Sequence, residues 1–183
     1  MRLKTALCGA VALSALALPA MAERGADGQL NIFYWQAPSI QNPYLSSGTK
    51  DVESSSLVLE ALAGYDEAGK EFPRLAAELP TVENGGIAAD YTSITWKLKE
   101  GLLWSDGTPV TSADVVFTAE YCMHPEGGCA QLSRYQNVSK VEAVDDLTVK
   151  VTFDQPKYNP LQAFVGSTSP ILQKAQFQDC MGA

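Results

Sequence analysis

The sequence predicts a mixed α and β fold, and three stretches of the chain carry that prediction. Residues 91–98 alternate apolar and polar side chains, as a strand with one buried face does, and they lead through a turn into a capped helix. Residues 138–144 and 147–153 are strand-like runs joined by an acidic turn. Residues 51–63 have the apolar content of a helix. No internal repeat, low-complexity tract or linker separates these stretches, so we expect one continuous α/β body.

The first predicted strand covers residues 29–35, where Gln-Leu-Asn-Ile-Phe-Tyr-Trp alternates enough for a strand. Pro38, Asn42-Pro43 and Ser46–Gly48 make the following stretch an irregular loop. Loops of this kind often carry function, so residues 36–48 are candidates for ligand contacts.

A helix is predicted over residues 51–63. Ser54–Ser56 are weak helix formers, but the leucines and the valine of residues 57–62 supply an apolar surface. Gly64 is a natural C-terminal stop because glycine tolerates the left-handed conformation that ends many helices.

The strand over residues 91–98 is followed by the strongest local signals in the chain. Asp106-Gly107 predicts a turn in which the glycine takes positive φ. Thr111 is a plausible N-cap, with Asp114 three residues later to complete a capping box. We therefore expect a helix from Ala113 to about Tyr121.

The last predicted elements are a hairpin and a short helical segment. Asp145-Asp146 joins the strands 138–144 and 147–153 into an antiparallel pair. Pro156 and Pro160 then break the pattern, and apolar residues recur at helical spacing from Ile171 onward.

The N-terminus reads as a secretory signal peptide. Arg2 and Lys4 precede an apolar run over residues 6–18, and Ala20-Met21-Ala22 forms a small-x-small cleavage site. The run is shorter than the roughly 20 apolar residues that a membrane-spanning helix needs. We expect cleavage after Ala22 and a mature chain that starts at Glu23.

Composition is that of an acidic protein, with 13 Lys and Arg against 21 Asp and Glu and a net charge of −8. A nucleic-acid surface needs clustered cations, and the sequence has no such cluster, so we expect no nucleic-acid partner. The acidic balance mildly favours cationic or zwitterionic solutes.

Residues Trp96–Phe117 read W-K-L-K-E-G-L-L-W-S-D-G-T-P-V-T-S-A-D-V-V-F. This stretch resembles the signature of family 5 extracellular solute-binding proteins, the peptide- and nickel-binding receptors of ABC importers. The resemblance extends over about residues 30–180. It implies an exported, periplasmic receptor without enzymatic activity or cofactor, in which two α/β lobes close over a solute and the closed form docks on the permease. A peptide is the first expectation for the solute; an opine, a nickel chelate or another small molecule stays open.

The resemblance also implies a division of the chain. Members of the family are far longer, so we expect this chain to correspond to an incomplete first lobe with an added β-rich subdomain. After the signal peptide at residues 1–22, residues 23–49 begin the lobe, residues 50–164 form the subdomain and residues 165–183 return to the lobe. Trp104 and Phe117 are then expected to be core residues of the scaffold.

Cys122 and Cys129 flank a stretch that can fold back on itself, since it contains one proline and two adjacent glycines. A small disulfide loop is the first interpretation in an exported chain. A metal site of Cys122, His124 and Cys129, and free thiols, are the alternatives, although the spacing is not that of usual zinc ligands and a fourth ligand is lacking. The resemblance favours the disulfide, because some subgroups of the family carry a similar segment after the signature helix. Cys180 is left without a partner in this sequence.

A solute pocket combines aromatic surface with a few placed polar groups. The end of the first predicted strand and the loop after it have that character, and Gly166–Ser169 can bring backbone to the same place. The candidate ligand-binding residues are Trp35, Gln36, Asn42, Tyr44, Ser167 and Ser169.

Two other function classes are weighed against a transport receptor. Ser47-Gly48-Thr49-Lys50 matches the S-x-x-K pattern of serine acyl enzymes, but the accompanying S-D-N and K-T-G patterns are absent and the serine falls in a loop. The other alternative is an exported interaction protein whose β-rich subdomain binds a partner.

Overall fold

The computed structural model describes residues 28–182, which form two units, residues 28–34 and residues 35–182. The signal peptide and cleavage site predicted for residues 1–22 lie outside the described residues. Residues 28–34 form neither helix nor strand, and the strand predicted over residues 29–35 is wrong. A strand is stabilised by ladder hydrogen bonds to a neighbour, and no ladder among the described residues includes this segment.

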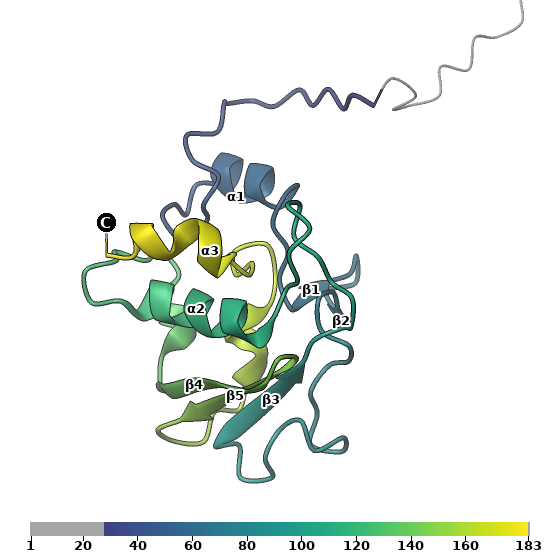
Figure 1. Cartoon of the computed structure of the whole chain (residues 1–183), viewed down its shortest axis with the longest axis vertical. Helices are drawn as coiled ribbons and strands as arrows, with labels where there is room; N and C mark the ends of the chain where they lie inside the picture. The colour runs from purple at the N-terminus through teal and green to yellow at the C-terminus, as the bar shows by residue number, and fades with distance from the viewer. Residues whose placement is uncertain (1–27, 183) are drawn as a thin grey trace, which may run out of the picture. The chain divides into compact units, whose positions relative to one another are not determined.

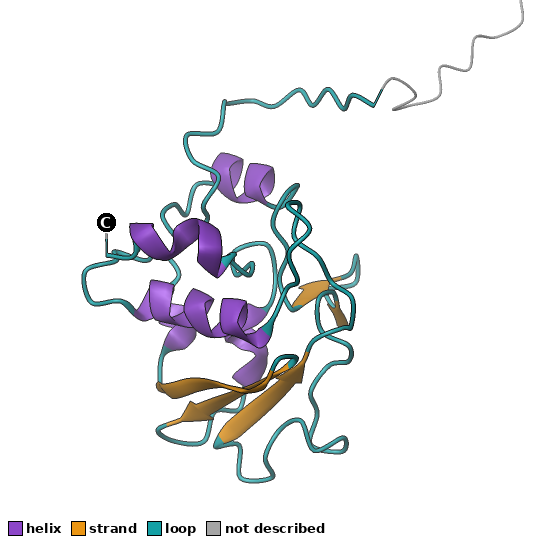
Figure 2. Cartoon of the chain, viewed as in Figure 1, coloured by secondary structure: helices purple, strands orange, loops and turns teal. Residues whose placement is uncertain are grey.

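The larger of two sheets is antiparallel, with the strand order β3-β5-β4 (Figures 1 and 2). Its strands are β3 (Ser93–Lys97), β4 (Val138–Asp145) and β5 (Thr148–Phe153). Trp96 lies opposite Val149, and Val141 lies opposite Val151. Because side chains alternate across a strand, β3 and β5 place every second residue in the core. The strands predicted over residues 91–98, 138–144 and 147–153 are therefore confirmed.

Helix α2 (Ser112–Met123) packs against this sheet, as Figure 1 shows. The predicted capping box is present, and the Asp114 carboxylate accepts the backbone N–H of Thr111 at 3.0 Å. Phe117 is buried between helix and sheet, as expected for a scaffold residue. The largest fully buried side chains of the core are Trp96, Tyr44, Phe117, Phe164, Leu62, Ile94, Ile171 and Leu172.

Helix α1 (Thr49–Ser55) is shorter than the helix predicted over residues 51–63. The hydroxyls of Ser54, Ser55 and Ser56 each donate to a backbone carbonyl three residues earlier, at 2.7–3.3 Å. Serine hydroxyls that bond the backbone compete with helical hydrogen bonds. The chain consequently leaves the helix before it reaches the apolar residues 57–62.

Residues 57–62, the second half of that predicted helix, form a turn and a loop, and a small hairpin follows them. Strand β1 (Ala63–Tyr65) pairs with β2 (Glu71–Pro73), and the sequence analysis did not predict either. Asp66 closes the turn, since its Oδ1 accepts the backbone N–H groups of Ala68 and Lys70, both at 2.9 Å. Ala63 also forms a parallel bridge with Val165, so residues near 165 lie beside β1.

Short helical turns complete the unit: η1 (Leu132–Tyr135), η2 (Pro160–Phe164), α3 (Lys174–Phe177) and η3 (Gln178–Cys180). Of the helical spacing expected from Ile171 onward, only α3 is helical; Ile171 and Leu172 precede it and are buried in the core. Helix α3 lies against α2 in Figure 1. Cys122 and Cys129 form the predicted disulfide, with 5.1 Å between their Cα atoms. Within residues 28–182, no helix is long and apolar enough to cross a membrane.

Candidate functional site

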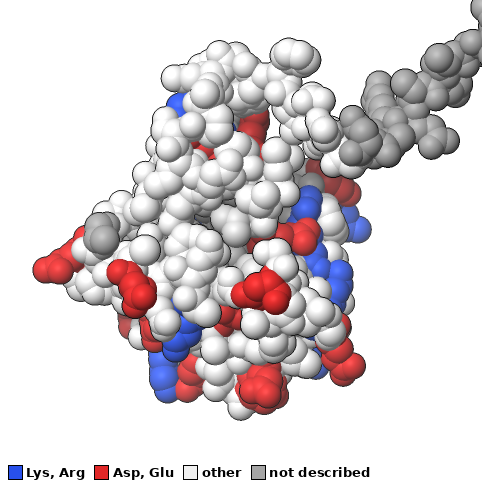
Figure 3. All heavy atoms as spheres, turned by 45° about the horizontal axis from the view of Figure 1, so that its top comes forward, with Lys and Arg blue, Asp and Glu red and all other residues white. Residues whose placement is uncertain are grey.

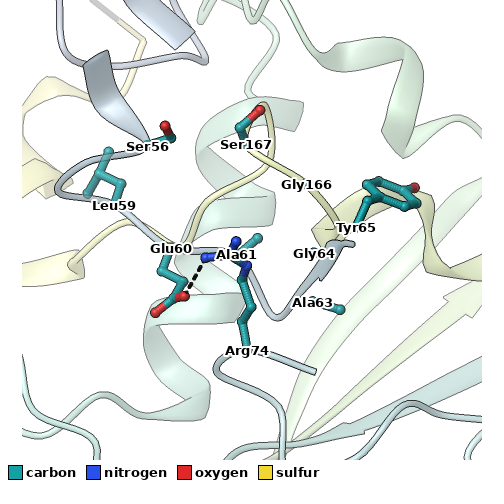
Figure 4. A pocket seen from close by; sticks show the side chains of 10 residues that line it. All are labelled: Ser56, Leu59, Glu60, Ala61, Ala63, Gly64, Tyr65, Arg74, Gly166 and Ser167. Atoms are coloured by element: carbon teal, nitrogen blue, oxygen red, sulfur yellow. Dashed lines mark hydrogen bonds and ion pairs between the residues drawn. The ribbon is translucent and has the colours of Figure 1, made fainter. Parts of the chain in front are cut away.

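An open pocket of about 270 Å³ lies where the segment after α1 meets β1 and the loop after η2 (Figure 4). Its walls come from three parts of the chain: residues 56–65, Arg74 and Gly166-Ser167. The bridge between Ala63 and Val165 brings the first and last of these parts together. The pocket contains one of the predicted ligand residues, Ser167, on its rim.

An ion pair forms one side of the pocket. Arg74 Nη1 lies 2.8 Å from Glu60 Oε1, and the two side chains are 43% and 47% exposed. The Arg74 guanidinium also lies over the Phe72 ring, 5.1 Å from its centroid, which is a cation–π contact. Gly64 lies directly beneath, because a Cβ on Gly64 would overlap the Arg74 side chain. The guanidinium is therefore held in one place by its surroundings.

The opposite side is built on Gly166. This glycine has a φ of +86°, and a Cβ there would lie 3.3 Å from the Tyr65 ring. Glycine adopts this conformation without strain and lets the ring approach the backbone. Figure 4 shows Tyr65 beside Gly166, with Ser167 next along the loop. Among the hydrogen bonds of the described residues, none involves the Ser167 hydroxyl, and its side chain is exposed.

A second cavity, of about 410 Å³, shares Leu59 and Glu60 with the first. It is bordered by Gln41, Trp104 and Phe177, among others. Trp104 is half-buried and donates from Nε1 to the Asp114 carboxylate at 3.2 Å. Trp104 therefore packs against the core, as expected of a scaffold residue, and it also lines this cavity.

The predicted ligand residues fall into an exposed set and a buried set. Trp35 is 72% exposed, and Gln36 and Ser167 are exposed as well. Asn42, Tyr44 and Ser169 are buried. Only Ser167 borders the pocket of Figure 4.

The buried set supports the loop over residues 36–48 from within. Asn42 Nδ2 donates to the Tyr121 hydroxyl at 3.1 Å, and Asn42 Oδ1 accepts the Tyr44 N–H at 3.0 Å. The Tyr44 hydroxyl donates to the Pro170 carbonyl at 2.7 Å, and burial raises the pKa of this hydroxyl well above its usual value. Ser169 Oγ has no hydrogen-bond partner among the described residues.

Asp51 fixes the same loop from the side of α1. Its carboxylate is almost fully buried and lies 2.7 Å from Lys50 Nζ. It also accepts the Ser39 N–H at 2.6 Å and the Ser46 hydroxyl at 2.7 Å. These donors, the Lys50 ammonium foremost, hold the pKa of the Asp51 carboxyl far below its usual range. The loop over residues 39–46 is therefore tied to the start of the helix.

The residues of the S-x-x-K pattern are not arranged as a nucleophile and its base. Lys50 Nζ is bonded to Asp51 and to the Ser39 hydroxyl, and α1 begins after Ser47 rather than with it. The alternative of a metal site at Cys122, His124 and Cys129 is wrong, because the two sulfur atoms are bonded to each other.

The sequence analysis missed Glu60, Tyr65 and Arg74. One local signal was available: Asp66–Gly69 between two short apolar runs is typical of a hairpin turn, which would have placed Arg74 beside residues 62–64. No local signal connects Tyr65 to Gly166, since that contact depends on the long-range bridge between Ala63 and Val165.

Charge on the visible face in Figure 3 is mixed, with Lys and Arg interspersed among Asp and Glu. Lys97 and Glu78 form a second exposed pair at 3.7 Å, and Lys140 and Glu142 a third at 2.5 Å. Of the ten Lys and Arg in residues 28–182, four form an ion pair with a carboxylate.

Comparison with protein families gives one match. The model of the bacterial extracellular solute-binding proteins, family 5 (middle region), matches residues 72–180, which is more than half of the chain. The match includes the stretch 96–117 and the disulfide loop.

Curated and solved proteins agree with this match. The glutathione-binding protein GsiB of Escherichia coli (strain K12) is 31% identical over 115 residues, which are 63% of this chain and 21% of that protein. The substrate-binding protein CtaP of Listeria monocytogenes aligns with a TM-score of 0.66 and 30% identity over 79% of this chain and 28% of that one. The murein tripeptide-binding protein MppA of Escherichia coli, described as periplasmic, aligns with a TM-score of 0.68 and 21% identity over 78% of this chain and 30% of that one, a likeness of fold alone. The chain thus spans about a fifth of the curated relative and under a third of the two solved structures.

Proposed function

Because this chain belongs to the family 5 bacterial extracellular solute-binding proteins, a family of binding proteins and not of enzymes, we propose that it serves an ABC importer as its solute-binding component. The solute is a small peptide, which the receptor captures in the periplasm and delivers to the permease. The family match over residues 72–180 is the observation that carries this proposal. Glutathione and the murein tripeptide, named for two of the similar proteins, are both short peptides.

The chain forms part of the first of two lobes in this proposal. Residues 23–49 begin the lobe, residues 50–164 are its β-rich subdomain and residues 165–183 return to it. Among residues 28–182, all five strands lie between residues 63 and 153, which supports the assignment of residues 50–164 to the β-rich subdomain. The basic and apolar N-terminal run supports export and cleavage after Ala22.

Solute contacts are assigned to the exposed members of the predicted set. Trp35 supplies an aromatic surface, Gln36 an amide and Ser167 a hydroxyl beside an open pocket. The side chains of Asn42 and Tyr44, and the backbone N–H of Ser169, which donates to the Gly166 carbonyl at 3.0 Å, instead stabilise the loops from inside. Asp51 has the same supporting role for residues 39–46.

Tryptophan fluorescence tests this function, because the three tryptophans differ in exposure. Trp35 is exposed, Trp96 is fully buried and Trp104 is half-buried. Titration with trialanine is expected to change the emission saturably, with a Kd on the order of 1 mM, because Trp35 lies exposed on the surface and outside the pocket. Trp35→Phe is expected to lose the response, whereas Trp104→Phe retains it.

Maltose at the same concentrations is the control for non-specific effects. A response to trialanine that does not saturate, or an equal response to maltose, contradicts the proposed function.

A further inference from the structure

We propose that Arg74 and Glu60 form a charge-exchange subsite for a zwitterionic solute, an inference that rests on the proposed function. The Arg74 guanidinium takes the carboxylate of the solute, and Glu60, released from Arg74, takes its ammonium group. The ligand class is a free amino acid or short peptide with both end groups unmodified.

The ion pair can open because it is exposed. Both side chains are close to half exposed, and ion pairs of this kind contribute little stability. A solute carboxylate can therefore replace Glu60 on Arg74 at small cost. The released Glu60 then offers its charge to the other end of the same molecule.

Arg74 is prepared for a carboxylate by its surroundings. The Arg74 guanidinium lies over the Phe72 ring, its side chain packs on the Gly64 backbone, and the backbone N–H of Arg74 donates to the Leu62 carbonyl at 2.9 Å. A guanidinium has five N–H donors in a fork that matches a carboxylate. Among the described residues, Glu60 is the one acceptor bonded to the Arg74 side chain, through Nη1, so further donors remain for a ligand.

The remaining walls fit a small polar molecule. The Ser167 hydroxyl is available on the rim, and the Tyr65 ring closes one side (Figure 4). The volume of about 270 Å³ is just below the range of roughly 300–1,000 Å³ typical of ligand pockets, which suits an amino acid or dipeptide.

The Lys97–Glu78 pair provides a matched comparison. It is also exposed, at 63% and 52%, and it borders a smaller cavity of about 110 Å³ away from Ser167. Lysine is a point charge without the planar fork of arginine. Lys97→Gln therefore removes the same charge as Arg74→Gln without touching the proposed subsite.

The experiment follows the backbone amides of the isotopically labelled chain by NMR during titration with glycyl-glycine. Saturable shifts are expected at Gly64, Arg74, Gly166 and Ser167. Glycyl-glycinamide, which lacks the carboxylate, and N-acetyl-glycyl-glycine, which lacks the ammonium group, are each expected to bind about tenfold more weakly, as for the loss of one charge-assisted hydrogen bond.

Variants test whether Arg74 binds the carboxylate of the solute and Glu60 its ammonium group. Arg74→Gln is expected to weaken glycyl-glycine about tenfold, and Lys97→Gln to leave its binding unchanged. Glu60→Gln is expected to weaken glycyl-glycine but not the acetylated dipeptide. The amide spectra of the variants report whether each is folded.

Two results overturn the subsite, and they differ in what they mean for the proposed function. Saturable shifts confined to residues 35–48 overturn the subsite and leave the proposed function standing. Equal binding of all three dipeptides at Gly64 and Ser167 overturns the charge assignment. A saturable tryptophan response to trialanine remains the independent test of the proposed function itself.

Discussion

The Asp114 carboxylate accepts the backbone N–H of Lys174 at 2.9 Å, across 60 residues of sequence. Its other oxygen accepts the Thr111 N–H at 3.0 Å and Trp104 Nε1 at 3.2 Å. One nearly buried side chain therefore caps α2, orients the tryptophan of the signature stretch and ties α3 to the first turn of α2. This junction fixes Lys174, the first residue of α3, beside the first turn of α2.

Asp114→Asn is expected to lower the free energy of unfolding by about 2 kcal/mol, since it removes a helix cap and faces an amide NH₂ toward buried donors. Urea unfolding followed by circular dichroism measures the change. Glu67→Gln, at an exposed turn, is the control and is expected to change little. A variant as stable as the wild type contradicts the role given to Asp114.

Reduction of the Cys122–Cys129 disulfide is expected to lower the free energy of unfolding by about 2–3 kcal/mol, from the loop entropy of a short cross-link. Unfolding midpoints with and without dithiothreitol measure it. Cys180→Ser serves as the control, because Cys180 is exposed and outside this bond, and its response to reductant should match that of the wild type. Separately alkylated Cys122 and Cys129 in non-reduced peptides would refute the disulfide.

The Asp51 carboxylate is expected to make the stability of the fold depend on pH. Because its folded-state pKa is depressed below that of the unfolded chain, it stabilises the fold above about pH 4 and loses this effect as the pH falls further. The unfolding midpoint of Asp51→Asn is therefore expected to fall less steeply from pH 6 to pH 3 than that of the wild type. Identical slopes for the two proteins contradict the assignment.

Gly166→Ala is expected to destabilise the protein more than Gly69→Ala does. Both glycines have positive φ, which costs about 1 kcal/mol for alanine, but only at Gly166 does the added Cβ also meet a neighbour, the Tyr65 ring. Thermal unfolding of the two variants separates backbone strain from contact with Tyr65. Equal losses contradict the close packing of Tyr65 on Gly166.

Export of the full chain in a bacterial host is expected to yield a protein that starts at Glu23. N-terminal sequencing of the periplasmic fraction measures this. Recovery of soluble exported protein with Met1 intact refutes a cleaved signal.

Local signals predicted much of the fold. The capping box at Thr111 and Asp114, the alternation in β3 and β5 and the Pro-Glu-Gly-Gly stretch between Cys122 and Cys129 each act within a few residues, and the structure confirms all three. The remainder depends on contacts that are distant in sequence. Residues 29–35 have strand-like alternation but no partner strand among the described residues. The hydroxyls of Ser54–Ser56 ended α1 early, an effect that helix propensity alone underestimates.

In the candidate site, too, local sequence signals could not indicate contacts between residues that are distant in the chain. Residue type suggested Trp35, Gln36 and Ser167 as surface contacts, and the structure leaves them exposed. Residue type could not indicate that the side chains of Asn42 and Tyr44 are buried, because their partners Tyr121 and Pro170 are 79 and 126 residues away. Arg74 and Glu60 are ordinary surface charges in the sequence, and only the fold places them at a pocket with Ser167.

Photocrosslinking with a diazirine-labelled tripeptide, mapped by mass spectrometry, tests peptide capture by this face of the protein most directly. The proposed function predicts adducts within residues 35–48, 56–74 and 165–167, and their loss when unlabelled trialanine competes. Adducts spread over the β4–β5 hairpin, or adducts that trialanine does not displace, would contradict it.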